Sequence, residues 1–225
     1  MELAPGLYGL SLDASMGDRE LTLNPVAVET PRGLLLVDVG LPERVDVLAD
    51  ALDAEGLALD DTWAVAVTHQ DLDHVGCLAA VVDRTHAAVF AHEAAVPYLE
   101  GETELVKSTA ERPMELDPVT VDVHLTGGET FATAAGPLRA IHTPGHSPGH
   151  LSFVVPEADL LVSADALKVV DGALTGPRPD VTRDLEVAWE SVATLADLDV
   201  SRTFCFHGGY VDAGADRLDE LLAER

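Results

Sequence analysis

Residues 68–74 read Thr-His-Gln-Asp-Leu-Asp-His and follow directly on the apolar run Thr62–Val67. The run predicts a buried strand, and apolar residues at helical spacing resume after it. His69–His74 therefore places two imidazoles and two carboxylates at a strand-to-helix turn. This density of nitrogen and oxygen donors indicates a metal site, and the alternative is a polar turn in which Asp73 caps the helix.

Three later segments place the same residue types at the ends of other predicted strands. His146 lies in the turn Thr143-Pro144-Gly145-His146, which proline and glycine make rigid. Asp165 and His207 each end a further apolar run. Loops held by a rigid scaffold suit a catalytic metal, which needs fixed ligands and one open position for water. The four segments together predict a catalytic metal centre.

The rest of the chain alternates strand patterns with helical ones. Strands are predicted at residues 6–12, 21–29, 34–38, 62–67, 87–91, 119–125, 138–142, 151–155 and 160–163. Helices are predicted between Pro42 and Gly56, after residue 74, at 93–99, from a Thr182 cap to Leu195, and around 218–222. Two strand-rich halves that each end in helices indicate an α/β or α+β fold with two central sheets and helices outside. Because no repeat or linker interrupts the chain, residues 1–225 are expected to form a single domain.

The charge of the chain argues against several partners. Its 40 acidic and 13 basic residues give a formal net charge of −27, which makes nucleic acid an unsuitable partner. Such a surface repels itself at low ionic strength, so the chain is expected to come from a halophile with a salt-rich cytoplasm, the alternative being a merely acidic protein. We find no leader pattern at the start and no apolar run of about 20 residues, so we expect a cytoplasmic protein without a membrane partner. Cys77 and Cys205 are expected to be buried and apolar rather than disulfide-bonded.

The ordered segments resemble the metallo-β-lactamase superfamily, in which an H-x-H-x-D-H segment precedes a His, an Asp and a final His. The resemblance also covers the opening strand that ends at Asp38 and Gly40. It implies a four-layer αββα sandwich and a centre of two divalent metal ions. By this resemblance the first metal is bound by His69 and His146, the second by Asp73, His74 and His207, and both by Asp165.

Asp71 departs from the family pattern, because most members have a histidine at this position. A carboxylate there could bind the first metal, bind it through water, or leave the position weaker. We expect zinc for both ions, and the carboxylate of Asp71 makes iron or manganese the alternative. Flavodiiron-type members also carry a carboxylate at this position, together with a flavin domain for which this sequence has no candidate. The segment also resembles a stand-alone prokaryotic subgroup with an H-Q-D-x-D-H motif.

The resemblance implies a hydrolase in which a hydroxide activated by two metals attacks a small ester, thioester or lactone, with Asp73 orienting it. No G-x-S-x-G or G-x-x-x-x-G-K-[ST] motif offers another chemistry. The alternatives are a diiron redox protein that receives electrons from a separate donor, and a metal-binding module without turnover. The oligomeric state is left open.

Further residues are expected to support the centre. Asp38 could orient a ligand such as His69 or cap a turn, and His150 is expected to hold the ligand loop. Lys168 and Arg178 are candidate holders of a substrate anion, with solvated surface charge as the alternative. The remaining histidines are expected to be structural or, for His92, near the cleft; they are His86, His92, His124 and His142. The charged segment Glu100–Pro118 is expected to be a surface excursion beside the site.

The charge of −27 predicts a strong dependence of stability on salt. At low ionic strength the acidic side chains repel one another over about 30 Å at 0.01 M salt, whereas concentrated KCl shortens this range to a few ångströms. We expect loss of folded structure, followed by circular dichroism, on dialysis to low salt, and recovery in concentrated KCl. Equal thermal stability at both salt levels would contradict a halophilic origin.

Overall fold

Two apolar runs of the first half form the centre of a seven-stranded sheet in the computed structural model, which describes residues 1–16 and 19–225. Strands β6 (Gly33–Val37) and β7 (Thr62–Val67) are parallel neighbours in this sheet. The sheet order is β1-β2-β5-β6-β7-β8-β9. The flanking strands are β1 (Glu2–Ala4), β2 (Leu7–Gly9), β5 (Val26–Thr30), β8 (Ala88–His92) and β9 (Val123–Leu125).

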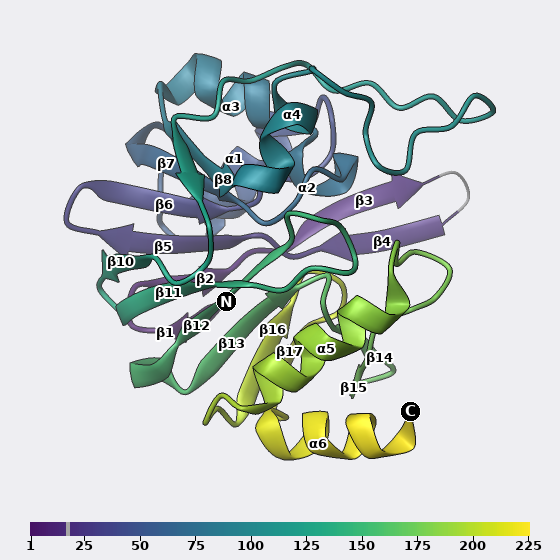
Figure 1. Cartoon of the computed structure of the whole chain (residues 1–225). Coiled ribbons are helices and arrows are strands. Elements are labelled where there is room, and N and C mark those ends of the chain that lie inside the picture. Colours follow the sequence, from purple (N-terminus) through teal and green to yellow (C-terminus); the bar gives the residue numbers. More distant parts are fainter. Residues whose placement is uncertain (17–18) are drawn as a thin grey trace.

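The central strands read as continuous apolar runs because both of their faces are buried. On β6, Leu34 and Leu36 point into one core, whereas Leu35 and Val37 point into another. The first of these cores is covered by helices α1 (Val45–Ala54) and α3 (Leu78–Thr85), as Figure 1 shows at the top. The short helices of the same half are η1 (Leu59–Asp61), α2 (Leu72–Val75), η2 (Glu93–Ala95) and α4 (Val96–Leu99).

The second half builds a six-stranded sheet by the same rule. Its order is β10-β11-β12-β13-β16-β17. On β12, Phe153 points into the core between the two sheets, and Val154 points into a third core under helices α5 (Leu185–Ala196) and α6 (Ala215–Glu224). The strands are β10 (Thr130–Thr133), β11 (Gly136–His142), β12 (Leu151–Val155), β13 (Leu160–Ala164), β16 (Arg202–Cys205) and β17 (Gly209–Val211), with η3 (Pro156–Ala158) after β12.

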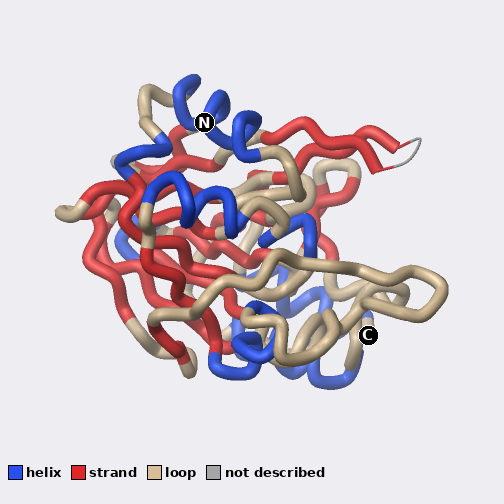
Figure 2. The backbone as a smooth tube through the Cα atoms, turned by 90° about the horizontal axis from the view of Figure 1, so that it is seen from above, coloured by secondary structure: helices blue, strands red, loops and turns tan. Residues whose placement is uncertain are grey.

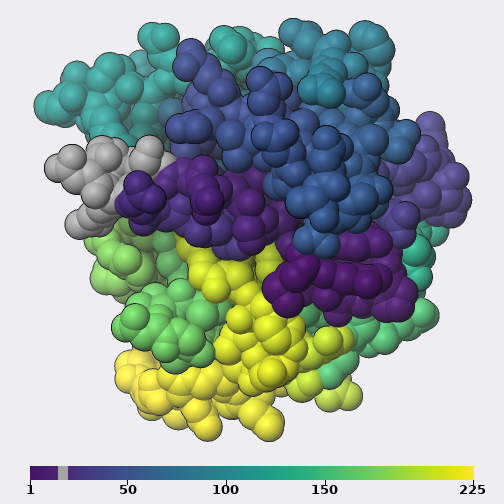
Figure 3. All heavy atoms as spheres, turned by 180° about the vertical axis from the view of Figure 1, so that it is seen from behind, coloured from purple at the N-terminus to yellow at the C-terminus, as the bar shows by residue number. Residues whose placement is uncertain are grey.

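Three apolar layers therefore separate four layers of secondary structure, which confirms the predicted α/β fold and its αββα sandwich. Figure 3 shows the division from behind, with the purple and blue of the first half above the green and yellow of the second. Two hairpins lie outside the sheets: β3 (Leu12–Met16) with β4 (Arg19–Leu23), and β14 (Lys168–Val170) with β15 (Ala173–Thr175). Figures 1 and 2 both show the β3–β4 hairpin and the excursion Glu100–Pro118 projecting on the same side of the molecule.

Some predicted boundaries were wrong. The strand predicted at 21–29 is two strands, β4 and β5, because the chain turns at Asn24-Pro25, where the Asn24 backbone N–H and side chain both donate to the Phe206 carbonyl. Proline also has no N–H for a strand ladder. Helix α5 begins at Leu185 with Asp184 as its cap rather than Thr182, since the Asp184 carboxylate accepts from the Val187 backbone N–H. The strand predicted at 119–125 is reduced to β9.

Parallel pairing determines where the functional side chains meet. Strands β6, β7 and β8 run parallel in the first sheet, and β13 and β16 run parallel in the second. Their carboxyl ends lie at one edge of each sheet, which is where ligands bind in open α/β sheets. Within the described residues, none of the helices has the length and hydropathy of a membrane span. Cys77 and Cys205 are buried free thiols, as predicted, and burial raises the pKa of each to about 12.

We expect Leu36→Ala to lower the free energy of unfolding by about 2–5 kcal/mol, because the Leu36 side chain is fully buried in the core between the first sheet and the outer helices. Val123→Ala on β9 is the control, since Val123 is 39% exposed and its truncation should change stability by less than about 0.5 kcal/mol. Chemical denaturation at constant salt measures both. Equal effects of the two substitutions would contradict the layer assignment.

Candidate functional site

A first cluster forms where β7 ends. His69 follows β7, Asp71 immediately precedes helix α2, and His146 lies in the loop between β11 and β12. The Asp71 Oδ2 atom lies 3.2 Å from His69 Nε2 and 3.1 Å from His146 Nε2. All three side chains are buried. Asp71 therefore reaches the same point in space as the two imidazoles, despite its shorter side chain.

A second cluster forms around the first turn of α2. Asp73 and His74 lie on this helix, and His207 follows β16. The His207 Nε2 atom lies 3.2 Å from Asp73 Oδ2. Asp73 is thus inside the helix rather than its cap, and it turns toward a side chain from the opposite half of the molecule. The cap position of α2 is held by Asp71.

Asp165, which follows β13, lies between the two clusters. Its Oδ2 atom is 3.4 Å from His146 Nε2 in the first cluster. Its Oδ1 atom is 3.4 Å from His207 Nε2 and 3.5 Å from His74 Nε2 in the second. The structure thus brings together all seven residues that the sequence singled out as metal ligands.

Three of the facing donor atoms lack a hydrogen-bond partner, whereas Asp71 Oδ2 and His146 Nε2 contact each other. His69 Nε2, His74 Nε2 and Asp165 Oδ1 are buried and have no hydrogen-bond partner among the described residues. Buried polar atoms are normally satisfied, so such atoms call for a missing partner. A zinc ion with bonds of about 2.0–2.1 Å holds tetrahedral ligand atoms about 3.3 Å apart. The separations of 3.1–3.5 Å fit this geometry, so the clusters can hold metal ions.

Asp38 positions the second cluster. Its φ is +61°, and its Oδ2 atom lies 2.7 Å from His74 Nδ1. The Thr68 backbone N–H and hydroxyl both donate to the Asp38 carboxylate, at 2.8 and 2.7 Å. Asp38 therefore orients His74 directly and not His69, whose Nδ1 atom lies 3.0 Å from the Thr68 hydroxyl. This contact leaves His74 Nε2 facing the cluster, as a metal ligand requires.

The protonation states follow from burial and from the neighbouring charges. Burial, together with the nearby His74, lowers the pKa of His69 to about 4, so its imidazole is neutral. Burial also opposes a charge on His74, but the carboxylates of Asp38 and Asp165 raise its pKa well above the ordinary value. The surrounding imidazoles hold the pKa of Asp165 well below its usual range against the opposing effect of burial. The site is thus rich in carboxylate charge that a cation would balance.

His150 supports Asp165 through a chain of hydrogen bonds. Burial and the neighbouring His69 and His146 lower its pKa well below the ordinary value, so the ring is neutral. The Asp165 backbone N–H donates to His150 Nε2 at 3.1 Å, which places the ring proton on Nδ1, 2.8 Å from the Thr143 hydroxyl. The Thr143 hydroxyl in turn lies 2.9 Å from the Ser152 hydroxyl, which donates to the Ser163 carbonyl. Because each group in this chain donates to the next, the neutral His150 ring carries its proton on Nδ1.

Sequence reasoning missed Lys107, which extends from the excursion Glu100–Pro118 to the first cluster. Its ammonium contacts Asp71 Oδ2 and lies 2.9 Å from His146 Nε2. The other Asp71 oxygen accepts from Gln70 Nε2 at 3.3 Å. Burial opposes the charge on Asp71, but His69, His146 and Lys107 hold its pKa well below the usual range. The available signal was compositional, because Lys107 is one of only two lysines in a chain of net charge −27.

The other basic candidates lie beside the second cluster. Lys168 and Arg178 line a hollow of about 580 Å³ together with His207, called here the His207 hollow. Arg178 is exposed and ion-paired with Asp180. The sequence proposed both residues as holders of a substrate anion, and in the structure the Arg178 guanidinium is already paired with the Asp180 carboxylate.

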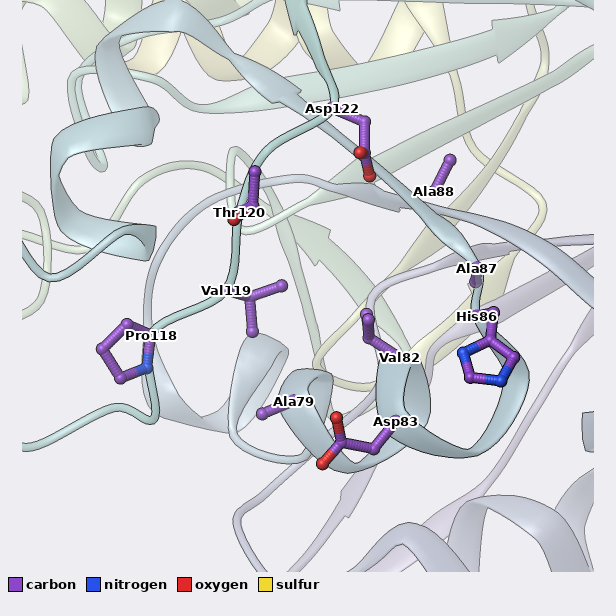
Figure 4. Close-up of a pocket in the computed structure, with 10 residues that line it drawn as sticks. All are labelled: Ala79, Val82, Asp83, His86, Ala87, Ala88, Pro118, Val119, Thr120 and Asp122. Atoms are coloured by element: carbon purple, nitrogen blue, oxygen red, sulfur yellow. The ribbon is translucent and has the colours of Figure 1, made fainter.

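The remaining histidines lie outside the clusters. His142 stacks on His92 with ring centroids 3.8 Å apart, and its Nε2 lies 3.0 Å from the Pro148 carbonyl oxygen. His124 is exposed on β9. His86 ends α3 and lines a separate pocket of about 450 Å³, shown in Figure 4, between that helix and residues 118–122. None of the seven clustered residues lines this pocket, so it is not part of the site.

Comparison with known proteins places the chain in a family. A model described as the metallo-β-lactamase superfamily matches residues 20–207. The "Probable metallo-hydrolase YflN" of Bacillus subtilis (strain 168) is 25% identical over 240 residues, which cover 92% of this chain and 90% of that protein. Hydroxyacylglutathione hydrolase of Ruegeria pomeroyi is 29% identical over 178 residues, which cover 79% of this chain but only 58% of that longer protein.

A solved structure gives the same result for the fold. A metallo-β-lactamase family protein from Thermus thermophilus superposes with a TM-score of 0.79 at 26% identity, covering 99% of this chain and 80% of that one. The match includes both sheets and the edge at which the two clusters meet, because it extends over nearly the whole chain. With its four-layer sandwich and a family model that matches most of its length, the chain belongs to the metallo-β-lactamase superfamily.

Proposed function

We propose that this chain is a hydrolase that uses two divalent metal ions to cleave a small ester, thioester or lactone. The position of Asp165 carries the proposal, because its two oxygens face two separate clusters at 3.4–3.5 Å. A carboxylate that faces two donor sets in this way is suited to bridge two ions. Membership in a superfamily of metallo-hydrolases supports the same chemistry.

Each cluster offers nitrogen and oxygen donors that could bind one metal ion. We assign His69, Asp71 and His146 to the first ion and Asp73, His74 and His207 to the second, as the donor groups in the structure suggest. Zinc suits this mixture of imidazole and carboxylate and is the first choice. The carboxylate of Asp71 adds charge and oxygen to the first cluster, which favours iron or manganese as alternatives.

The protein's own residues would prepare the substrate for attack. The two ions, when bound, would lower the pKa of a water molecule toward neutrality and polarise the acyl oxygen. Burial opposes the charge of Asp73, but His74 and His207 lower its pKa to about 2, so it is a carboxylate. Asp73 is only half-buried and can accept a hydrogen bond from the attacking water and orient it. Asp38 and His150 hold His74 and Asp165 in place.

The proposed substrate class rests on two observations. The related hydroxyacylglutathione hydrolase acts, by its name, on an acyl compound. A net charge of −27 is unfavourable for nucleic acids and other polyanions, which leaves small molecules. We therefore propose a small acyl substrate, and the charge of −27 supports the further proposal of a salt-rich cytoplasm.

Metal removal tests the proposal directly. Protein purified at high salt should contain divalent metal and hydrolyse at least one member of an ester, thioester and lactone panel, and a chelator should abolish both. His146→Ala and Asp165→Ala should each lower turnover at least about 100-fold and lower bound metal, because each removes a donor from the clusters. His124→Ala is the control, since this exposed histidine lies outside the clusters.

Two results would overturn the assignment. Undiminished turnover in either ligand variant would show that the clusters do not carry the reaction. Iron in the purified protein, with consumption of dioxygen when a reductase is supplied and no hydrolysis, would favour the diiron redox alternative instead.

Asp71→His tests which metal the first cluster selects. We expect the substitution to shift preference toward zinc, because it replaces a charged oxygen donor with a neutral nitrogen donor. Metal titration followed by elemental analysis compares the two proteins. Identical metal identity, stoichiometry and affinity in both would mean that Asp71 is not a ligand.

A further inference from the structure

Basic side chains are scarce in this protein, and several of them, including both lysines, lie beside the metal-binding clusters. Only 13 of 225 residues are lysine or arginine, and five of them line the two hollows that flank the clusters. Both lysines of the chain are among these five. The five residues are Lys107, Arg112 and Arg183 in one hollow and Lys168 and Arg178 in the other. A local excess of cations on so acidic a chain points to an anionic ligand.

The first of these, called here the Lys107 hollow, has a volume of about 720 Å³ and lies between the excursion and residues 180–183. It adjoins the first cluster at two points. The Lys107 ammonium contacts Asp71 and lies 2.9 Å from His146 Nε2. The backbone N–H of Arg183 donates to the carbonyl of His146 at 3.4 Å. A molecule held in this hollow is therefore beside the site of hydrolysis.

The charges of the Lys107 hollow are only partly neutralised within it. Arg112 and Arg183 are exposed and form no ion pair with any residue that the structure describes. Two carboxylates also line the hollow, Glu104 and Asp180, and that of Asp180 is already paired with Arg178. The Lys107 ammonium has three donors, of which Asp71 and His146 take two and leave one free. The cations thus retain free donors for an anion.

The rest of the lining combines apolar side chains with the hydroxyls of Thr103 and Thr182. Tyr98, Val106 and Met114 contribute to the walls between the basic groups. Apolar walls with a few placed polar groups are typical of sites for small organic ligands. A carboxylate on a short carbon chain matches this combination, since arginine and lysine bind carboxylates through charge-assisted hydrogen bonds.

We propose that the Lys107 hollow binds a carboxylate of the substrate, so that the enzyme prefers acyl compounds that carry a negative charge. This inference rests on the proposed hydrolytic function. Lys107 and Arg183 hold the carboxylate, and Arg112 adds to the local positive charge. The acyl carbon then lies toward the clusters, because Lys107 contacts both the hollow and the first cluster. Local cations are needed for this, since the acidic surface repels a free anion.

A matched pair of esters tests the preference. Mono-4-nitrophenyl succinate and 4-nitrophenyl butanoate share the leaving group and the four-carbon acyl chain, but only the succinate ester carries a carboxylate. We expect the wild-type protein to have the lower KM for the succinate ester at constant KCl. Arg183→Met should raise this KM about tenfold and leave the KM for butanoate unchanged, because it removes one charged hydrogen bond to the ligand. Lys107→Met should also raise the KM for the succinate ester, but it changes the surroundings of Asp71 and His146 as well, so the selectivity is judged on Arg183→Met.

A binding measurement separates this proposal from the hydrolytic one. Calorimetry with succinamate, which has an amide in place of the ester, reports anion binding even if neither ester is cleaved. We expect succinamate to bind the metal-loaded wild-type protein and butanamide not to bind, and each Met variant to weaken succinamate binding about tenfold.

Two further variants serve as controls. Arg84→Met removes the same charge from the exposed end of α3, outside both hollows, and should change neither KM nor binding. Lys168→Met removes a charge from the His207 hollow without breaking an ion pair of the described residues and should behave like Arg84→Met, whereas Arg178 is unsuitable because its partner Asp180 lines the Lys107 hollow. Loss of succinamate binding only in Lys168→Met would overturn the proposal by placing the anion in the His207 hollow. Unchanged affinity in Arg183→Met, whose side chain forms no ion pair with the described cluster residues, would overturn it as well.

Discussion

The structure depends on the burial of carboxylates among imidazoles at the edge where the two sheets meet. Asp38, Asp71 and Asp165 are almost fully buried, and each is surrounded by histidine nitrogens or by N–H and O–H donors. Buried charges are tolerated only when they are paired and hydrogen-bonded. The loops that follow β6, β7, β11, β13 and β16 each carry a donor to the clusters or a residue that holds one. The loops come from both halves of the chain, so the clusters also join the two sheets.

The scaffold allows this concentration of polar groups because the strands behind it are apolar on both faces. Leu35 and Phe153, from opposite sheets, share the core between them, and outer helices cover the remaining face of each sheet. The carboxyl ends of the parallel strands emerge from this rigid core at one edge. Side chains that must be held to within a fraction of an ångström are better placed on such ends than on long free loops.

The acidity of the molecule and the chemistry of its site are connected. An overall charge of −27 raises the energy of any further buried anion, yet the clusters contain several carboxylates. Metal ions would offset that charge inside the site, and five of the 13 lysines and arginines, including both lysines, line the hollows beside it. The basic groups nearest the clusters therefore differ in role from the acidic groups elsewhere on the chain.

The sequence by itself determined the apolar runs of the two sheets and the order of the polar ligand segments, because these are local features of a chain; the αββα sandwich and the grouping of His69, His146 and Asp165 came from the family resemblance. Its assignment of the metals, of a single domain and of a halophilic origin stays a prediction. Only the tertiary structure decided that Asp38 orients His74, that Asp71 reaches the first cluster, and that Lys107 joins it. Lys107 is 36 residues from Asp71 in an excursion without regular secondary structure, so no periodicity marks its direction. Contacts of this kind depend on how a loop folds back over a finished core, which local sequence patterns do not encode.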